Sequence, residues 1–273
     1  MNTLERWCIR VRHHPALEQA SFWNGVRPLY NNVIRALAGR RGLERIVNGT
    51  DAIRIAPEWR GIQEVYEPSV WERFTSDARP GDVVVDVGAF VGLYTIALAK
   101  RVGPHGSVVA FEPDPTNFAW LQRHVVLNRV QHHVTLVRAA VADRAGEAGF
   151  LSRDNESHLG DVQKGGLRVP VTTLDEEFPT QRVDLLKVDV EGHEEQVLRG
   201  GMRLLSDAAR GPRTIYVEVH PYAWKGVGTS SESFLQLLSI CGFDVSTLNG
   251  QPVVVIDRYE EIVAQRRVGP SSA

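Results

Sequence analysis

The most constraining feature of this sequence is a short apolar run that ends in a glycine-containing turn. Residues 82–87 are almost continuously apolar and follow Pro80-Gly81. Such a run is typical of a strand that is buried on both faces of a parallel sheet. Gly88 and Gly92 follow it, and helical spacing begins at Leu93. A strand that passes through glycines into a helix predicts an open α/β sheet with a ligand site at the strand's carboxyl end.

The alternation of strand and helix continues along the chain, which indicates a mostly parallel, doubly wound sheet of the Rossmann-like kind. Strands are predicted at 82–87, 107–111, 134–140, 183–190 and 214–219, and helices at 93–101, 115–130, 194–205 and 231–240. Two further pairs of strands are predicted to be antiparallel. They are an insertion, 147–151 with 167–173 around a polar loop at 152–166, and a closing pair, 243–246 with 252–256.

We expect three parts in the chain. Residues 1–65 form an N-terminal extension that reads as helical to about residue 40. In that extension Asn48-Gly49 lies between two β-rich runs, which predicts a tight hairpin because this dipeptide favours positive φ at both turn positions. Residues 66–262 form the main domain, and residues 263–273 form a tail that we expect to be disordered.

Composition narrows the class of protein. Lys and Arg total 31 and Asp and Glu total 33, a formal net charge of −2, so there is no basic field that would capture nucleic acid. No apolar run is long enough to span a bilayer, and the N-terminus lacks the apolar segment of a signal peptide. Cys8 and Cys241 match no metal or redox spacing. We therefore expect a cytoplasmic protein without a transmembrane segment or a nucleic-acid partner.

The turn after the first core strand has the residue types of a nucleoside-cofactor site. Gly88 permits a sharp turn and the close approach of a ligand, and Gly92 lets the next helix begin close to the strand. Glu112, 20 residues beyond Gly92, ends the next predicted strand and can accept the ribose hydroxyls. This spacing of glycines is not the G-x-G-x-x-G loop of NAD sites. The carboxylate of Asp86 would repel a pyrophosphate and attract a methionine ammonium, which favours S-adenosylmethionine.

Several segments resemble, in order, the motifs of FkbM-type methyltransferases. They are residues 86–95, 111–115 with Asn117, 169–175, 186–194 and 218–220. The resemblance covers about residues 66–220, with weaker similarity in the N-terminal segment. It implies a class I methyltransferase fold and the S-adenosylmethionine-dependent O-methylation of a hydroxyl. The acceptors that it implies are sugars of glycans or glycolipids, or secondary metabolites.

The resemblance also assigns residues to roles. It places cofactor contacts at Asp86, Gly88 and Glu112, and it places Asp189 and Glu191 at the acceptor side of the fourth core strand. Our cofactor-binding candidates are Asp86, Gly88, Ala89, Gly92, Glu112 and Asp143. Ala89 stands where many such loops have glycine, a variation that this family tolerates. Our catalytic candidates are Asp189, Glu191, Glu218 and His220.

The chemistry of the site leaves alternatives open. His220 has the ordinary pKa best suited to act as a base near neutral pH, and Asp189 is placed to converge with it over the methyl group. Asp189, Glu218 and His220 also form a donor set that suits Mg²⁺ or Mn²⁺, which could ease deprotonation of the acceptor. Lys187 is expected either to be buried and paired with Glu218 or to point into solvent.

Three other functions compete with O-methylation. Methyl transfer to nitrogen is closest in chemistry, although residues 189–192 lack the Asp/Asn-Pro-Pro-aromatic pattern of many N-methyltransferases. An NAD-dependent oxidoreductase would need the missing glycine loop. A non-catalytic S-adenosylmethionine-binding protein would be expected to lose the polar residues after the fourth and fifth core strands, and here they are present.

Overall fold

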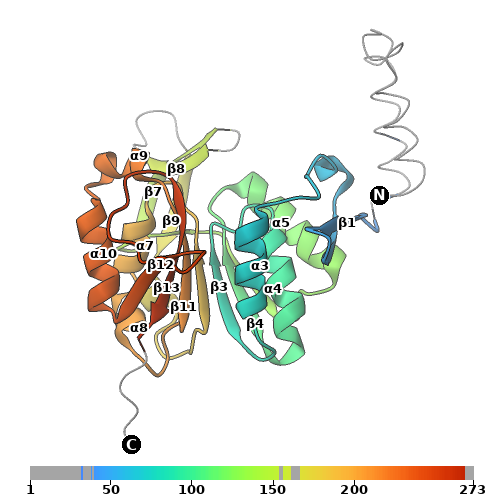
Figure 1. Cartoon of the computed structure of the whole chain (residues 1–273). Coiled ribbons are helices and arrows are strands. Elements are labelled where there is room, and N and C mark those ends of the chain that lie inside the picture. Colours follow the sequence, from blue (N-terminus) through green and yellow to red (C-terminus); the bar gives the residue numbers. More distant parts are fainter. Residues whose placement is uncertain (1–31, 33–37, 39, 154–155, 161–166, 268–273) are drawn as a thin grey trace, which may run out of the picture.

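The computed structural model describes residues 32, 38, 40–153, 156–160 and 167–267. A seven-stranded sheet runs through the protein in the order β12-β13-β11-β10-β3-β4-β5, with helices on both faces (Figure 1). The strands are β3 (Val83–Val87), β4 (Ser107–Phe111), β5 (Val134–Val137), β10 (Leu185–Val188), β11 (Thr214–Val219), β12 (Phe243–Thr247) and β13 (Glu260–Arg266). The pairs from β11 to β5 are parallel, and β13 is antiparallel to β11 and to β12. The expected mostly parallel, doubly wound α/β sheet is confirmed.

Helices cover both faces of this sheet, which explains why its central strands are apolar along their whole length. Val84 packs in the cluster that contains α4, whereas its neighbour Val85 packs in the cluster that contains α7 and α10. The helices are α3 (Pro68–Asp77), α4 (Leu93–Val102), α5 (Pro115–Asn128), α6 (Leu174–Glu177), α7 (Glu194–Arg199), α8 (Met202–Ser206), α9 (Pro221–Trp224) and α10 (Ser231–Ile240), with 3-10 turns η1 (Pro57–Trp59), η2 (Gly103–His105) and η4 (Lys225–Val227). None of the helices in the described part of the chain is long and apolar enough to cross a membrane.

The strand order changes direction between β3 and β10, and this point positions the site. From β3 the chain adds β4 and then β5 on one side, and later adds β10 and β11 on the other. Connections therefore diverge above the carboxyl ends of β3 and β10, where a crevice opens in sheets of this kind. Val87 pairs with Val188, so Gly88 and Asp189 leave the sheet side by side.

The predicted N-terminal hairpin is present. Strands β1 (Leu43–Val47) and β2 (Asp51–Ile55) are antiparallel, and the turn residues Asn48 and Gly49 have φ of 50° and 75°. Positive φ at both positions is the geometry that Asn-Gly favours at the centre of a β-hairpin turn. The buried side chains of the hairpin belong to the same cluster as α4 and α5. The helix expected before residue 40 falls almost entirely outside the described residues.

The insertion after the third core strand is larger than the sequence suggested. The predicted strand 134–140 is divided, because β5 ends at Val137 and β6 (Ala140–Val141) joins a second sheet in the order β6-β9-β7-β8. The antiparallel pairing of β7 (Gly146–Arg153) with β9 (Leu167–Thr172) is confirmed. The region expected to be a polar loop contains a strand, β8 (Glu156–Gly160), which pairs with β7.

Three boundaries in the C-terminal half were wrong. Residues 252–256 do not form the strand that was predicted to pair with 243–246, although Val253 N–H donates a hydrogen bond to the carbonyl of Val245. The partner is β13, and Pro252 makes only an isolated bridge to Ser246. Proline lacks the N–H that a strand between two neighbours must donate. Strand β13 continues to Arg266, so residues 263–266 of the expected tail belong to the sheet. The predicted helix 194–205 is broken at Gly200, where a Cβ would lie 1.9 Å from the carbonyl oxygen of Ala142.

Candidate active site

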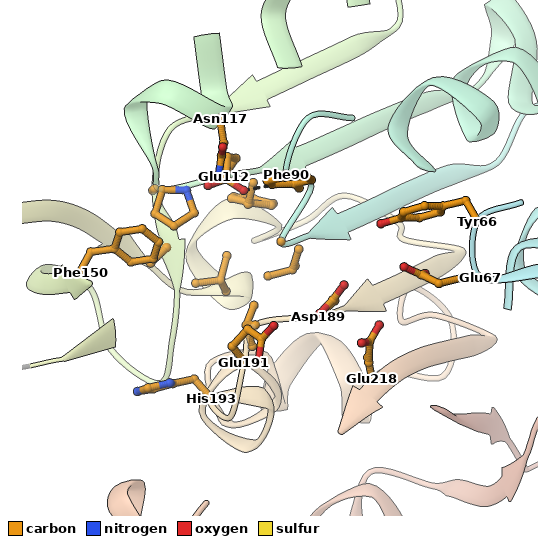
Figure 2. Close-up of a pocket in the computed structure, with 18 residues that line it drawn as sticks. Tyr66, Glu67, Phe90, Glu112, Asn117, Phe150, Asp189, Glu191, His193 and Glu218 are labelled. Carbon is orange, nitrogen blue, oxygen red and sulfur yellow. Dashed lines mark hydrogen bonds between the residues drawn. The ribbon is translucent and has the colours of Figure 1, made fainter. Parts of the chain in front are cut away.

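A cavity of about 400 Å³ lies at the carboxyl ends of β3, β4, β10 and β11 (Figure 2). Its volume falls in the range of roughly 300–1,000 Å³ that is typical of small-molecule sites. Its walls are apolar and aromatic beside β4 and carboxylate-rich beside β10 and β11. The lining residues are Tyr66, Glu67, Val87, Gly88, Phe90, Phe111, Glu112, Pro113, Asn117, Ala139, Ala140, Val141, Phe150, Asp189, Val190, Glu191, His193 and Glu218.

Glu112 is the polar centre of the apolar half of the cavity. It follows β4, and its carboxylate oxygens accept hydrogen bonds from the backbone N–H groups of Phe90 (2.9 Å) and Asp114 (2.8 Å). Burial raises the pKa of Glu112 to about 8, against the opposing effect of these two hydrogen bonds. The carboxylate is therefore held in one orientation, and its ionisation would gain from further donors such as a ligand's hydroxyl groups.

Packing within the protein requires glycine at position 88. Its φ is +86°, and a Cβ at this position would lie 1.8 Å from the backbone carbonyl oxygen of Asp189. The turn after β3 thus passes directly against the end of β10, which only glycine permits. The sequence predicted that Gly88 permits a sharp turn and the close approach of a ligand; the turn is present, and the close neighbour in the structure is the Asp189 carbonyl. Gly92, at φ +91°, likewise lets α4 pack against α5, because a Cβ there would lie 2.4 Å from Leu121 Cδ1.

The other predicted cofactor residues do not line the cavity. Asp86 is buried, its Oδ2 accepts a hydrogen bond of 2.6 Å from Thr95 Oγ1, and no described residue donates to its Oδ1. Burial raises the pKa of Asp86. Ala89 is buried behind the turn. Asp143 lies outside the cavity and pairs with the adjacent Arg144 at 3.3 Å.

Several lining residues were not among the predicted site residues. Tyr66 and Glu67 reach the cavity from the segment before α3, and Phe90 and Phe150 form aromatic walls (Figure 2). Glu67, Phe90 and Glu191 have positive φ (39°, 50° and 50°), three of the five such non-glycine residues in the described part of the chain. Strained backbone of this kind concentrates at functional sites. No local sequence signal predicts positive φ at glutamate or phenylalanine.

The carboxylates of Asp189 and Glu218 lie on neighbouring strands at the other end of the cavity. Beneath them, the buried Lys187 donates a hydrogen bond of 2.8 Å to Asp189 Oδ2, and its ammonium lies 4.8 Å from the centre of the Tyr94 ring. Burial alone would lower the pKa of Lys187, but the surrounding carboxylates, Asp189 first, raise it overall. Lys187 is therefore a buried cation whose hydrogen bond goes to Asp189 and not to Glu218.

His220 is held as a cation behind the carboxylates. Its Nδ1 lies 2.8 Å from Glu194 Oε1, and its Nε2 lies 3.5 Å from both Glu191 Oε2 and Glu218 Oε1. Burial would lower the pKa of His220, but its hydrogen bonds to Glu194 and Glu218 outweigh this and raise it to about 10. The expectation of a pKa near neutrality at His220 was wrong, because three carboxylates surround the ring.

The expected metal-ligand set is brought together, since ligand atoms of Asp189, Glu218 and His220 lie within 4.8 Å of one another. However, Lys187 already donates to Asp189 Oδ2, and both ring nitrogens of His220 face carboxylate oxygens. The observed bonding fits a network of ion pairs better than a divalent cation.

Comparison with known proteins identifies the family of this chain. The sequence matches the family model "Methyltransferase FkbM domain" over residues 86–245. The 31-O-demethyl-FK506 methyltransferase FkbM of Streptomyces tacrolimicus is 29% identical over 246 residues, which cover 76% of this chain and 89% of that protein. The hexuronic acid methyltransferase AglP of Haloferax volcanii is 26% identical over 215 residues, covering 77% of this chain and 80% of that protein.

Other similar proteins are much longer than this chain or have lower sequence identity to it. The chain spans 11% and 57% of the length of two further curated relatives. A solved structure of an S-adenosylmethionine-dependent O-methyltransferase from Thermotoga maritima is 18% identical, with 79% of this chain and 71% of that chain covered and a TM-score of 0.46.

Proposed function

The chain belongs to the FkbM family of S-adenosylmethionine-dependent methyltransferases, and we propose that it methylates a hydroxyl oxygen of a sugar, a glycolipid or another small molecule. The main observation that supports this proposal is the carboxylate-lined end of the cavity, where Asp189, Glu191 and Glu218 lie beyond the apolar half. Carboxylates at this place can hydrogen-bond a hydroxyl and accept its proton. The name of the relative FkbM, which specifies a 31-O-demethyl substrate, supports methyl transfer to oxygen.

The residues of the apolar half fit the cofactor. S-adenosylmethionine supplies a methyl group that its sulfonium already activates. Glu112 would accept the ribose hydroxyls, and the aromatic side chains of Phe90 and Phe150 would contact the adenine. The buried charge of Asp86, whose Oδ1 accepts from no described residue, favours positive charge near the turn.

Asp189 acts as the base in this proposal. Burial raises the pKa of Asp189, which favours its uptake of a proton, whereas hydrogen bonds and neighbouring cations lower the pKa of Glu218. Lys187 fixes one oxygen of Asp189. His220 acts through the carboxylates that it holds, as a positioning residue. A positioned base adds roughly 10²- to 10⁴-fold to a rate.

The same carboxylates disfavour nitrogen as the methyl acceptor. An amine attacks a methyl group through its lone pair, and it loses that lone pair when it is protonated. Negative charge nearby stabilises the ammonium form and raises its pKa. The cluster of Glu67, Asp189, Glu191 and Glu218 would therefore keep an amine unreactive, whereas it would assist the loss of a hydroxyl proton.

The test is methyl transfer from labelled S-adenosylmethionine to metabolite, glycan and glycolipid extracts, with mass-spectrometric assignment of the methylated atom. We expect methyl ethers. Asp189→Asn should lower kcat by roughly 10²- to 10⁴-fold and leave cofactor affinity close to that of the wild type. Asp244→Asn, at an exposed position outside the cavity, is the matched control. Near-wild-type turnover by Asp189→Asn would remove it as the base, and a methylated nitrogen would refute the proposal.

A further inference from the structure

The acceptor end of the cavity contains more carboxylates than cations. The two buried cations are Lys187 and His220. Lys187 is surrounded by Glu67, Asp86, Asp189 and Glu218, and His220 by Glu191, Glu194 and Glu218. Among the described residues that line the cavity, none is a lysine or arginine. The negative charge therefore exceeds what these cations and the single charge of a sulfonium would offset.

Glu67, Glu191 and Glu261 share the two cations, Lys187 and His220, with the other carboxylates of this region. Burial raises the pKa of Glu67 and of Glu191, and hydrogen bonds and cations offset this only in part. Burial also raises the pKa of Glu261 to about 7, with further contributions from Glu218 and Glu67. A positively charged ligand in this region would offset both the cost of burying these carboxylates in their charged form and their mutual repulsion.

Two partly exposed tyrosines donate hydrogen bonds to carboxylates that line the cavity. Tyr222 donates its hydroxyl to Glu191 (2.6 Å) and Tyr259 donates to Glu218 (2.8 Å). The two tyrosines are 68% and 50% exposed, and both rings contact His220. The phenols thus orient carboxylates inward while much of each ring stays accessible. Aromatic rings beside carboxylates are the surroundings that proteins use to bind organic cations.

We propose that the acceptor carries a positively charged nitrogen close to the hydroxyl that is methylated, as in an amino sugar or an amino alcohol. Glu67 and Glu191 bind this nitrogen, and Asp189 faces the hydroxyl. This inference rests on the proposed O-methylation and adds the charge class of the substrate. Glu67 is the decisive residue because it enters from the segment before α3 and because its carboxylate points into the cavity beside Asp189 and Glu218 (Figure 2).

The inference predicts which acceptors are rejected. A carboxylate on the acceptor would meet Glu67, Glu191 and Glu218, and like charges in a site suppress the wrong partner. Uronic acids, the class in the name of the relative AglP, should therefore be poor substrates here. The ammonium remains protonated among these carboxylates, so it binds without being methylated.

The experiment uses the full chain, labelled S-adenosylmethionine and an extract of the source organism separated by cation and anion exchange. Labelled methyl ethers should appear mainly in the fraction that the cation exchanger retains. That fraction is then divided into two portions, which receive different chemical treatments before the assay. N-acetylation removes the positive charge and should cut labelling at least tenfold, whereas reductive N-dimethylation keeps the charge and should preserve it.

The variant Glu67→Gln should lower kcat/KM for the cationic fraction about tenfold or more. Glutamine can still accept the 2.8 Å hydrogen bond from Tyr94, so the fold should persist, which thermal unfolding checks. Glu64→Gln, an exposed position outside the cavity, should change nothing. Methyl ethers found mainly in the anionic or unretained fractions, or labelling unaffected by acetylation, would overturn this inference and leave O-methylation standing. Methylated nitrogen would overturn both.

Discussion

Gly88→Ala tests whether the turn after β3 is shaped by the protein chain itself. The added Cβ would lie 1.8 Å from the Asp189 carbonyl oxygen, so either the turn or the end of β10 must move. Because φ is +86°, alanine also pays about 1–2 kcal/mol for left-handed backbone. Forcing extra volume into packed structure costs about 1–3 kcal/mol more. The expected loss of stability is therefore roughly 2–5 kcal/mol.

Gly81→Ala is the matched control, since Gly81 has φ +88° and nothing within 4 Å of its hypothetical Cβ. It should lose only the conformational part, about 1–2 kcal/mol. Urea unfolding measures both variants, and calorimetry measures their affinity for S-adenosylmethionine. Gly88→Ala should lose cofactor binding because Gly88, Phe90 and Asp189 share the cavity wall, whereas Gly81→Ala should bind normally. Equal destabilisation of the two variants, or normal binding by Gly88→Ala, would refute the reasoning.

The remaining predictions concern titratable groups and metal dependence. Glu112→Gln should weaken S-adenosylmethionine binding about ten- to a hundredfold, since a charged hydrogen bond contributes about 1.5–3 kcal/mol. Glu64→Gln, at an exposed position outside the cavity, is the control, and an unchanged Kd of Glu112→Gln in calorimetry would contradict the ribose role. Because the pKa of Glu112 is about 8 and hydroxyl donors favour its ionised form, wild-type affinity should increase as the pH rises through 8, and Glu112→Gln should abolish that dependence. Lys187→Met should cost about 3–5 kcal/mol in urea unfolding, because it leaves buried carboxylates without their cation; a loss below 1 kcal/mol, roughly that of an exposed pair, would contradict this. Because the pKa of His220 is raised to about 10, the rate measured against pH should show no rise near the ordinary histidine pKa of about 6.5. EDTA should leave the rate unchanged, and a loss of activity in EDTA that Mg²⁺ restores would instead support a metal.

Much of the fold can be predicted from short, local patterns in the sequence. Residues 107–111 and 231–240 were predicted with the bounds that β4 and α10 have, because apolar periodicity and the flanking turn residues both act over a few positions. The Asn48-Gly49 turn follows from the φ preferences of its own two residues. Glu112, Asp189 and Glu218 were placed at one edge because the carboxyl ends of parallel strands meet there.

The tertiary structure decided what depends on neighbours distant in sequence. The sequence could not show that β13 and not 252–256 lies between β11 and β12, because a strand's place in a sheet depends on its partners. It could not assign Lys187 to Asp189, or show that Glu67 completes the acceptor end from outside the core motifs. The pKa of His220 is the sharpest case, since the same imidazole is a neutral base in water and a cation among Glu191, Glu194 and Glu218. Charge in a buried site is set by solvation and by nearby groups, and folding alone brings those groups together.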